Sequence, residues 1–192
     1  MILWLTLIWE LPNVIKKMSF YTSLSDIEQE MVHYRDYFED KTIFMNCDDP
    51  EWSNFWIYFE MNFNFLGLKR LISTHYVADG SEKAFALVLE RQEHNYPKLT
   101  KTNLKQNGDF RSEEAVAYLK KSDIVITNPP FSLWREYLAQ LVEYEKDFII
   151  LGNVNAITYK EGSELTFAFQ IWVYIIYIIL FLGLFFKGIL LI

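Results

Sequence analysis

The stretch SDIVITNPPFSLWREY, residues 122–137, joins a short apolar run to two prolines and then to a helical pattern. Residues 123–127 have the length and the β-branched side chains of a buried strand. Two consecutive prolines remove two backbone donors and prevent a helix from starting there, so the strand must end at Asn128. Residues 132–144 then return to helical spacing. The stretch therefore predicts a strand, a rigid polar turn and a helix, in that order.

The same alternation extends over most of the chain. Strands are expected at residues 42–45, 68–77, 84–92, 123–127 and 147–153, the third of them alone or in a hairpin. Helices are expected over residues 23–40 and 49–67, after Ser112, and over residues 132–144. Short apolar strands that alternate with helices are typical of a parallel, doubly wound α/β sheet.

Three helix starts are predicted from capping signals, one of them at Ser112, which is followed by Glu113 and Glu114 in the first turn. Ser25 and Glu28 form a capping box, which predicts a first helix of about four turns. Asp49 followed by Pro50 predicts the start of the second helix, because aspartate is a good cap and proline fits the first turn.

The overall charge does not indicate a nucleic-acid binder. The chain has 192 residues, enough for one domain, and a net charge of −7, whereas attraction to phosphate is supplied by clustered Lys and Arg. Residues 94–108 are the local exception, with Lys98, Lys101 and Lys105 and no acid. Charge patterning alone predicts a solvated loop there.

Cysteine and histidine usage limits the site chemistry. The single Cys47 excludes a disulfide framework and suits a reducing cytosol, so a cytoplasmic location is expected. The three histidines, His33, His75 and His94, stand far apart without a partner cysteine. No metal site is therefore expected.

The two ends of the chain differ from the middle. Residues 1–17 are predicted to be an apolar extension that is a poor signal peptide and too short to span a bilayer. Residues 171–192 contain one charge, Lys187, and qualify by length as a transmembrane helix, which would make the protein membrane-associated. The alternative, which we favour, is that residues 162–192 are not native to the fold, for example a frame-shifted end.

The residues at Asn-Pro-Pro-Phe suit the alkylation of a planar amine. In an open parallel sheet, ligands bind at the carboxyl ends of the strands, where this motif lies. The Asn128 amide oxygen and the Pro129 carbonyl can accept both N–H bonds of an exocyclic amine and leave its lone pair free. Phe131 can stack on the base, as a pocket for a flipped base requires. A core position for this ring is the alternative.

Several segments in order resemble the EcoRI-like adenine-specific DNA methyltransferases, over about residues 17–161. They are FYTSLSDIEQEM (20–31), NCDDPEWSNFW (46–56), NFNFLGLKRLISTHY (62–76), NGDF (107–110), the segment around NPPF, and GNVNAITYKE (152–161). The resemblance implies a Rossmann-like S-adenosylmethionine-dependent methyltransferase sheet in residues 18–161. That sheet would be incomplete and followed by a C-terminal hydrophobic helix. The expected activity is methylation of adenine N6 in DNA, of restriction–modification or phage type, impaired by truncation.

The resemblance also implies which residues carry the chemistry. The catalytic motif is Asn128, Pro129, Pro130 and Phe131. The cofactor-binding residues are Phe20, Tyr21 and Thr22 near the methionine moiety, the loop Asn46, Cys47, Asp48 and Asp49, and the pair Asp109 and Phe110 at the adenine. Core packing for Cys47 and Phe110, a turn role for Asp109, and a helix cap for one of the loop aspartates are the alternatives. The acidic residue expected after the second strand for the ribose is not evident, with Asp79 the nearest candidate.

The expected partners are double-stranded DNA with a flipped adenine, and a cognate restriction endonuclease that shares the site. A membrane is a partner only if the tail is a genuine span. The alternatives in function are an inactive remnant, another amino-methyltransferase (RNA guanine N2 or protein glutamine N5), and a membrane-anchored binding protein.

Overall fold

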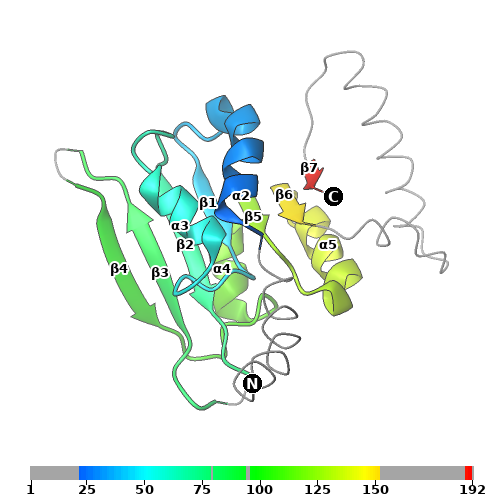
Figure 1. The fold of residues 1–192 in the computed structure, drawn as a ribbon. Coiled ribbons are helices and arrows are strands. Elements are labelled where there is room, and N and C mark those ends of the chain that lie inside the picture. Colours follow the sequence, from blue (N-terminus) through cyan, green and yellow to red (C-terminus); the bar gives the residue numbers. More distant parts are fainter. Residues whose placement is uncertain (1–21, 79, 94–95, 152–188, 192) are drawn as a thin grey trace, which may run out of the picture.

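The computed structural model describes residues 22–78, 80–93, 96–151 and 189–191, which form a seven-stranded sheet with helices on both faces (Figure 1). The strand order is β4-β3-β2-β1-β5-β6-β7. The strands are β1 (Thr42–Met45), β2 (Arg70–His75), β3 (Phe85–Glu90), β4 (Lys98–Asn103), β5 (Ile124–Thr127), β6 (Asp147–Leu151) and β7 (Ile189–Leu191). The helices are α2 (Leu24–Met31), α3 (Asn54–Met61), α4 (Glu113–Lys121) and α5 (Trp134–Glu143), with 3-10 turns η1 (Val32–Tyr37) and η2 (Phe131–Leu133).

The centre of the sheet is parallel and buried on both faces. β1 pairs in parallel with β2 and with β5, and β6 pairs in parallel with β5 and with β7. Every residue of β1 and β5 is buried. Parallel strands end at the same edge, so the segments that follow β1, β2 and β5 meet there. This confirms the α/β class and the central strands predicted from the sequence.

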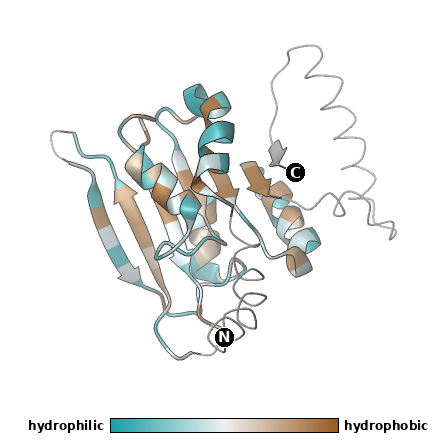
Figure 2. Ribbon diagram, in the orientation of Figure 1, coloured by the Kyte–Doolittle hydropathy of each residue, from teal (hydrophilic) through white to brown (hydrophobic). Residues whose placement is uncertain are grey.

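Two apolar clusters lie on opposite faces of the sheet. On one face, Ile43 and Met45 of β1 pack with α2 and α3, while on the other Phe44 packs with α4 and α5. The alternation follows from the pleat, which points successive side chains to opposite faces. In Figure 2 the hydrophobic colour gathers on the central strands, and the outward side of α2 is hydrophilic.

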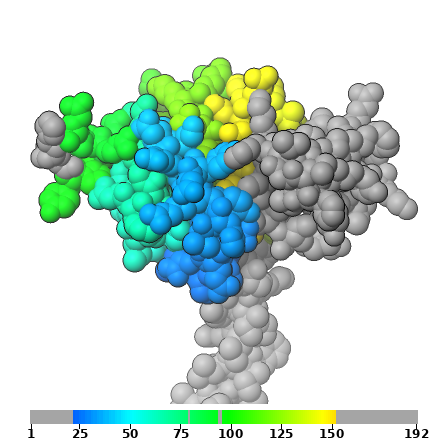
Figure 3. Space-filling view, turned by 90° about the horizontal axis from the view of Figure 1, so that it is seen from above, coloured from blue at the N-terminus to red at the C-terminus, as the bar shows by residue number. Residues whose placement is uncertain are grey.

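The edge of the sheet beyond β2 departs from the predicted parallel pattern. β3 is antiparallel to β2, and β4 is antiparallel to β3, so the sheet is mixed. The prediction of a solvated loop over residues 94–108 was wrong for residues 98–103, which form β4. All six residues of β4 are exposed, so the strand carries no apolar signal, and its backbone pairing with β3 holds it. This hairpin projects at one end of the molecule (Figure 3).

The predicted cap of α4 is confirmed, since the Ser112 hydroxyl accepts a hydrogen bond from the Ala115 amide at 3.2 Å, but the other two predicted caps were wrong. Ser23, not Ser25, accepts a hydrogen bond from the Asp26 amide and begins α2, because its extended backbone suits a cap. The helix gives way to the 3-10 turn η1 after Met31 instead of running for four turns. Ser53 caps α3 in place of Asp49, with the Phe55 amide as its donor.

The two ends of the chain lie largely outside the described residues. This is true of residues 1–17, and of residues 162–192 except 189–191. The expected helix over residues 171–192 is wrong at 189–191, which form β7, because the free edge of β6 offers ladder hydrogen bonds to an apolar segment. Apolar runs of this length do not distinguish a strand from a helix by periodicity. Among the described residues, no helix has the length and apolar character needed to cross a membrane.

Phe59→Ala should lower the free energy of unfolding by about 3–5 kcal/mol, because it deletes a ring from the core and leaves a cavity. Phe59 is fully buried and meets Phe38 edge to face, with ring centroids 5.3 Å apart. Met61→Ala on the same helix is the matched control, since Met61 is 74% exposed, and should change stability by no more than about 0.5 kcal/mol. Urea unfolding followed by circular dichroism measures both, and equal effects would contradict the packing described.

Candidate active site

The loop after β1 and the Asn-Pro-Pro-Phe motif after β5 lie side by side at the carboxyl edge of the sheet. β1 and β5 are paired neighbours, with Phe44 opposite Val125. The Cys47 amide donates a hydrogen bond to the Thr127 hydroxyl at 3.2 Å. The two segments that the sequence assigned to the cofactor and to catalysis are therefore adjacent.

Asp48 joins these two segments through its carboxylate. One oxygen, Oδ2, accepts hydrogen bonds from the Thr127 hydroxyl and, at 2.8 Å, from the Asn128 amide. The other, Oδ1, accepts from the Ser53 hydroxyl at 2.8 Å, and Ser53 also caps α3. Burial raises the pKa of the Asp48 carboxyl from its ordinary 3.8, against the opposing effect of its hydrogen-bond donors. The carboxylate of Asp48 is thus committed to protein donors.

The catalytic motif changes from buried to exposed along its length. Asn128 is half-buried and Pro129 buried, whereas Pro130 is exposed and extended, with φ −64° and ψ 121°. Phe131 begins η2 and is 43% exposed, so it is not a core aromatic. Its role in covering a base stays a prediction, and the exposed ring is available for it.

The NGDF segment packs against the end of β2. Gly108 has φ +79°, and a Cβ there would collide with the carbonyl oxygen of His75 and lie 3.2 Å from its carbonyl carbon. The Val77 amide donates to the Asn107 carbonyl at 2.9 Å, which holds this approach. Only glycine fits such a backbone contact at positive φ. The approach brings Asp109 and Phe110 to the edge that carries the other predicted site residues.

Asp109 and Phe110 each have partners within the protein. Both Asp109 oxygens accept hydrogen bonds from the Arg111 guanidinium at 2.8 Å, and these bonds lower the pKa of Asp109. Phe110 is buried and meets Tyr137 edge to face, with ring centroids 5.1 Å apart. Their contacts with the adenine of a cofactor remain predictions.

Tyr137 and Gln140 of α5 are site neighbours that the sequence analysis missed. The buried Tyr137 hydroxyl donates to Asn46 Oδ1 at 2.5 Å, and Gln140 Nε2 donates to the Phe110 carbonyl at 3.2 Å. Tyr137 stands on the buried face of α5, where helical spacing predicts only core packing, and Gln140 is half-buried beside that face. Within the described residues, Asn46 Nδ2 and Gln140 Oε1 are buried without a hydrogen-bond partner. Buried polar atoms without a partner are groups that a bound ligand or an ordered water can satisfy.

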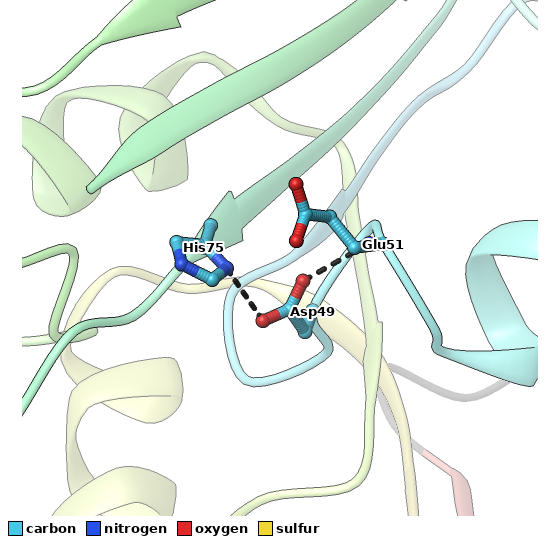
Figure 4. Close-up of side chains that lie close together, drawn as sticks. All are labelled: Asp49, Glu51 and His75. Carbon is cyan, nitrogen blue, oxygen red and sulfur yellow. Dashed lines mark hydrogen bonds and ion pairs between the residues drawn. The ribbon is translucent and has the colours of Figure 1, made fainter. Parts of the chain in front are cut away.

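Asp49 lies across the edge from Asp48 and contacts the end of β2. Its Oδ2 is 2.6 Å from His75 Nδ1, and its Oδ1 accepts from the Glu51 amide at 3.0 Å (Figure 4). The ligand atoms of Asp49, Glu51 and His75 lie within 4.8 Å of one another, which is close enough to hold a metal ion. The expectation of no metal site rested on how far apart the histidines lie in the sequence. That spacing does not reveal this group, because only folding brings the loop after β1 next to the end of β2.

The N-terminal motif is described only in part. Thr22 is half-buried, and its carbonyl accepts a hydrogen bond from Asn54 Nδ2 of α3 at 2.8 Å. Phe20 and Tyr21 lie outside the described residues, as does Asp79.

Comparison with known proteins identifies relatives over most of the chain. Residues 11–179 match the family described as Adenine-specific methyltransferase EcoRI, a range that extends beyond residues 17–161 at both ends. The Type II methyltransferase M.EcoRI of Escherichia coli is 48% identical over 168 residues, covering 82% of this chain and 52% of the relative. M.MgeORF184P of Mycoplasma genitalium is 40% identical over 145 residues, covering 76% of this chain and 44% of the relative. M.MpnI of Mycoplasma pneumoniae is 37% identical over 157 residues, covering 82% of this chain and 47% of the relative. The chain thus spans about half the length of these relatives, and no solved structure matches it.

Asp48→Asn should make stability less dependent on pH. Because the folded-state pKa of Asp48 is raised, its contribution to folding is fully present below the unfolded pKa of about 4 and is lost as pH rises through the raised value. Asparagine does not titrate, so the stability of the wild type relative to Asp48→Asn should fall as the pH rises above about 4. Urea unfolding at four pH values measures this, and a constant difference would contradict the raised pKa.

Gly108→Ala should destabilise the protein more than Gly80→Ala. Both glycines have positive φ, +79° and +68°, so both substitutions introduce backbone strain of about 1–2 kcal/mol. Nothing lies within 4 Å of a Cβ at Gly80, whereas at Gly108 the end of β2 must shift, which adds about 1–3 kcal/mol. Chemical denaturation of the two variants measures the difference in their free energies of unfolding, which is the cost of the clash. Equal losses of stability would show that the NGDF segment does not lie in close contact with the end of β2.

Proposed function

Because this chain belongs to the EcoRI family of adenine-specific methyltransferases, we propose that it carries the catalytic and cofactor-binding part of an enzyme that methylates adenine N6 in DNA. The relatives are named as Type II methyltransferases. Within the chain, one hydrogen bond carries the proposal. The Asp48 carboxylate accepts it from the backbone amide of Asn128 and so holds the catalytic motif against the loop after β1. The family favours DNA adenine over the RNA guanine N2 and protein glutamine N5 alternatives that NPPF alone leaves open.

The cofactor in this proposal is S-adenosylmethionine, which supplies an electrophilic methyl group on a sulfonium. The Asn128 amide oxygen and the Pro129 carbonyl accept the two N–H bonds of the flipped adenine amine. These bonds orient the nitrogen lone pair toward the methyl carbon. When bound, the cofactor would supply the methyl group, its C–S bond breaking as the new N–C bond formed, and the methylated amine would then release its proton to water, so that no general base is needed. The exposed Phe131 covers the base.

Three segments of the chain are assigned to the cofactor. We assign the methionine end to Phe20, Tyr21 and Thr22, and the adenine end to Asp109 and Phe110. We also assign the loop Asn46, Cys47, Asp48 and Asp49 to the cofactor, and the carboxylates of Asp48 and Asp49 hold this loop by accepting hydrogen bonds from the backbone amides of Asn128 and Glu51. Unpaired polar atoms on Asn46 and Gln140 supply further contacts.

The partner is double-stranded DNA, and a restriction endonuclease that cuts the same site would be its cognate enzyme. We place the protein in the cytoplasm, in keeping with its single cysteine. Membrane anchoring by residues 171–192 is the weaker alternative, since residues 189–191 of that segment form a strand.

Asn128→Ala should reduce methyl transfer by about 10²-fold or more, because it removes an acceptor that orients the reacting amine. The affinity for S-adenosylhomocysteine should stay within about twofold of the wild type. Asn64→Ala, at an exposed asparagine, is the matched control and should change neither. Labelled cofactor and DNA digestion measure the transfer, and unchanged turnover in Asn128→Ala would remove Asn128 from catalysis.

Two proteins should be assayed side by side. One is the 192-residue chain, and the other is residues 18–161 joined to the C-terminal half of the Escherichia coli relative. We expect labelled N6-methyladenine from the fusion, while label on cytosine or on protein would contradict the proposed function. Cofactor binding without transfer by the 192-residue chain would identify it as an inactive remnant.

A further inference from the structure

Arg111 contacts both residues that the proposed function assigns to the cofactor adenine. Its guanidinium donates to the Asp109 carboxylate from Nε and from Nη2, each at 2.8 Å. The same guanidinium lies over the Phe110 ring, with its central carbon 5.2 Å from the ring centroid, which is within the range of a cation–π interaction. Arg111 lies one residue beyond the NGDF motif, so the motif itself does not include this contact.

The hydrogen bonds from Arg111 leave the Asp109 carboxylate one acceptor site. Oδ1 accepts from the Arg111 amide at 2.9 Å and from Nε, while Oδ2 accepts from Nη2. An ionised carboxylate offers about four acceptor sites, two on each oxygen. Among the residues that the structure describes, these bonds therefore fill Oδ1 and leave one site on Oδ2. The Asp109 side chain is 17% exposed, so this site is open to a ligand.

Glu136 of α5 holds the far side of the guanidinium. Arg111 Nη1 lies 3.5 Å and 3.4 Å from the two carboxylate oxygens of Glu136. α5 begins directly after η2, the turn that contains Phe131 of the catalytic motif. An arginine suits this position, because its planar fork binds one carboxylate with two parallel donors and has a further donor for another. The guanidinium therefore joins the NGDF segment to the helix that follows the catalytic motif.

The guanidinium also keeps the Asp109 carboxylate ionised. The hydrogen bonds from Arg111 lower the pKa of Asp109, whereas its partial burial acts in the opposite direction. Two other titratable groups face this pair among the described residues. They are the Cys47 thiol, whose pKa is raised by burial and then by Asp48 and Asp109, and Glu136 beyond the guanidinium. An ionised carboxylate only accepts hydrogen bonds, so it can bind an amino group but not a carbonyl oxygen.

We propose that Arg111 is a positioning residue of the cofactor site, which orients the Asp109 carboxylate so that its one remaining acceptor site selects a 6-aminopurine over a 6-oxopurine. Glu136 supports Arg111 in this role. The assignment rests on the proposed function, because it requires that Asp109 receive the amino group of the cofactor adenine. It goes beyond that function by making the preference between the two purines depend on Arg111, which lies outside both motifs.

The test compares S-adenosylhomocysteine with S-inosylhomocysteine, whose purine carries a carbonyl in place of the amino group. Calorimetry on the 192-residue chain gives the ratio of the two dissociation constants at several pH values between about pH 5.5 and pH 8. For the wild type, S-adenosylhomocysteine should bind about 10- to 100-fold more tightly, as for a hydrogen bond to a charged group. This ratio should not change over the pH range, because Asp109 stays ionised.

Arg111→Met should bind S-adenosylhomocysteine about 10-fold more weakly and should lose its preference as the pH is lowered. Without the guanidinium, burial raises the pKa of Asp109, and a protonated carboxyl can donate to the carbonyl of the inosine analogue. The ratio should therefore fall below about threefold at the lowest pH. Arg111→Lys keeps the positive charge but lacks the planar fork, so its ratio should lie between those of the wild type and Arg111→Met.

Arg91→Met is the matched control. Arg91 is an exposed arginine that also pairs with an aspartate, Asp40, and its amide donates to the Lys69 carbonyl just before the start of β2. It therefore lies at the opposite edge of the sheet from the predicted site. The affinities for both ligands, and the ratio between them, should equal those of the wild type in this variant.

The outcomes separate the two proposals. If the wild type does not bind S-adenosylhomocysteine, the proposed function fails and the Arg111 assignment fails with it. If the wild type binds both ligands equally, only the Arg111 assignment is overturned. The same holds if Arg111→Met weakens both ligands by one factor at every pH, which is the result expected of an arginine that only stabilises the fold. Should Arg111→Met not fold, Arg111→Lys decides, and a ratio equal to that of the wild type would overturn the assignment.

Discussion

A single buried carboxylate determines how the carboxyl edge of this sheet is arranged. The oxygens of Asp48 accept hydrogen bonds from the Thr127 hydroxyl, the Asn128 amide and the Ser53 hydroxyl, which come from the ends of β5 and from the start of α3. Removing an ionised carboxylate from water is costly, and these donors offset the cost. Because the same side chain contacts the catalytic strand and a helix cap, neither segment can move without the other.

The second strand end extends this arrangement. Asp49, the next residue, turns to His75 on the opposite side of β1, so two consecutive aspartates connect β1 to its two neighbours in the sheet. Ser73 of β2 strengthens the same junction by donating to the carbonyls of Met45 and Asp48. The edge where the predicted catalytic and cofactor residues meet is therefore held by side-chain hydrogen bonds as well as by the parallel ladders.

The sequence predicted the centre of the fold well and its periphery poorly. The strands β1, β5 and β6 were recognised because burial on both faces leaves continuous apolar runs. β2 was recognised although only Leu71 and Ile72 of its residues are apolar, and β3, expected alone or in a hairpin, forms a hairpin with β4. β4 was missed because all its side chains are exposed, so that only its pairing with β3 makes it a strand. The start of α2 was misplaced because two serines, Ser23 and Ser25, stand close together and have the same propensity to cap a helix. The extended backbone of Ser23 makes it the cap, and the sequence alone does not show this. In the site, the order of the motifs predicted Asn128 and Asp109 at the carboxyl edge of the sheet. The contact between Asp49 and His75 was not predicted, because the two residues are 26 positions apart and no local sequence pattern indicates that they meet.

The exposed strand β4 has a consequence for the behaviour of the protein in concentrated solution. An edge strand presents unpaired backbone groups that can accept a strand from another molecule, and lysines on such an edge oppose this by charge repulsion. Lys98 and Lys101 both stand on β4, beside threonine and asparagine, and Leu99 is its only apolar residue. The sequence KLTKTN thus limits growth of the sheet in that direction. The hydrophilic strand that gave no folding signal protects the fold from self-association.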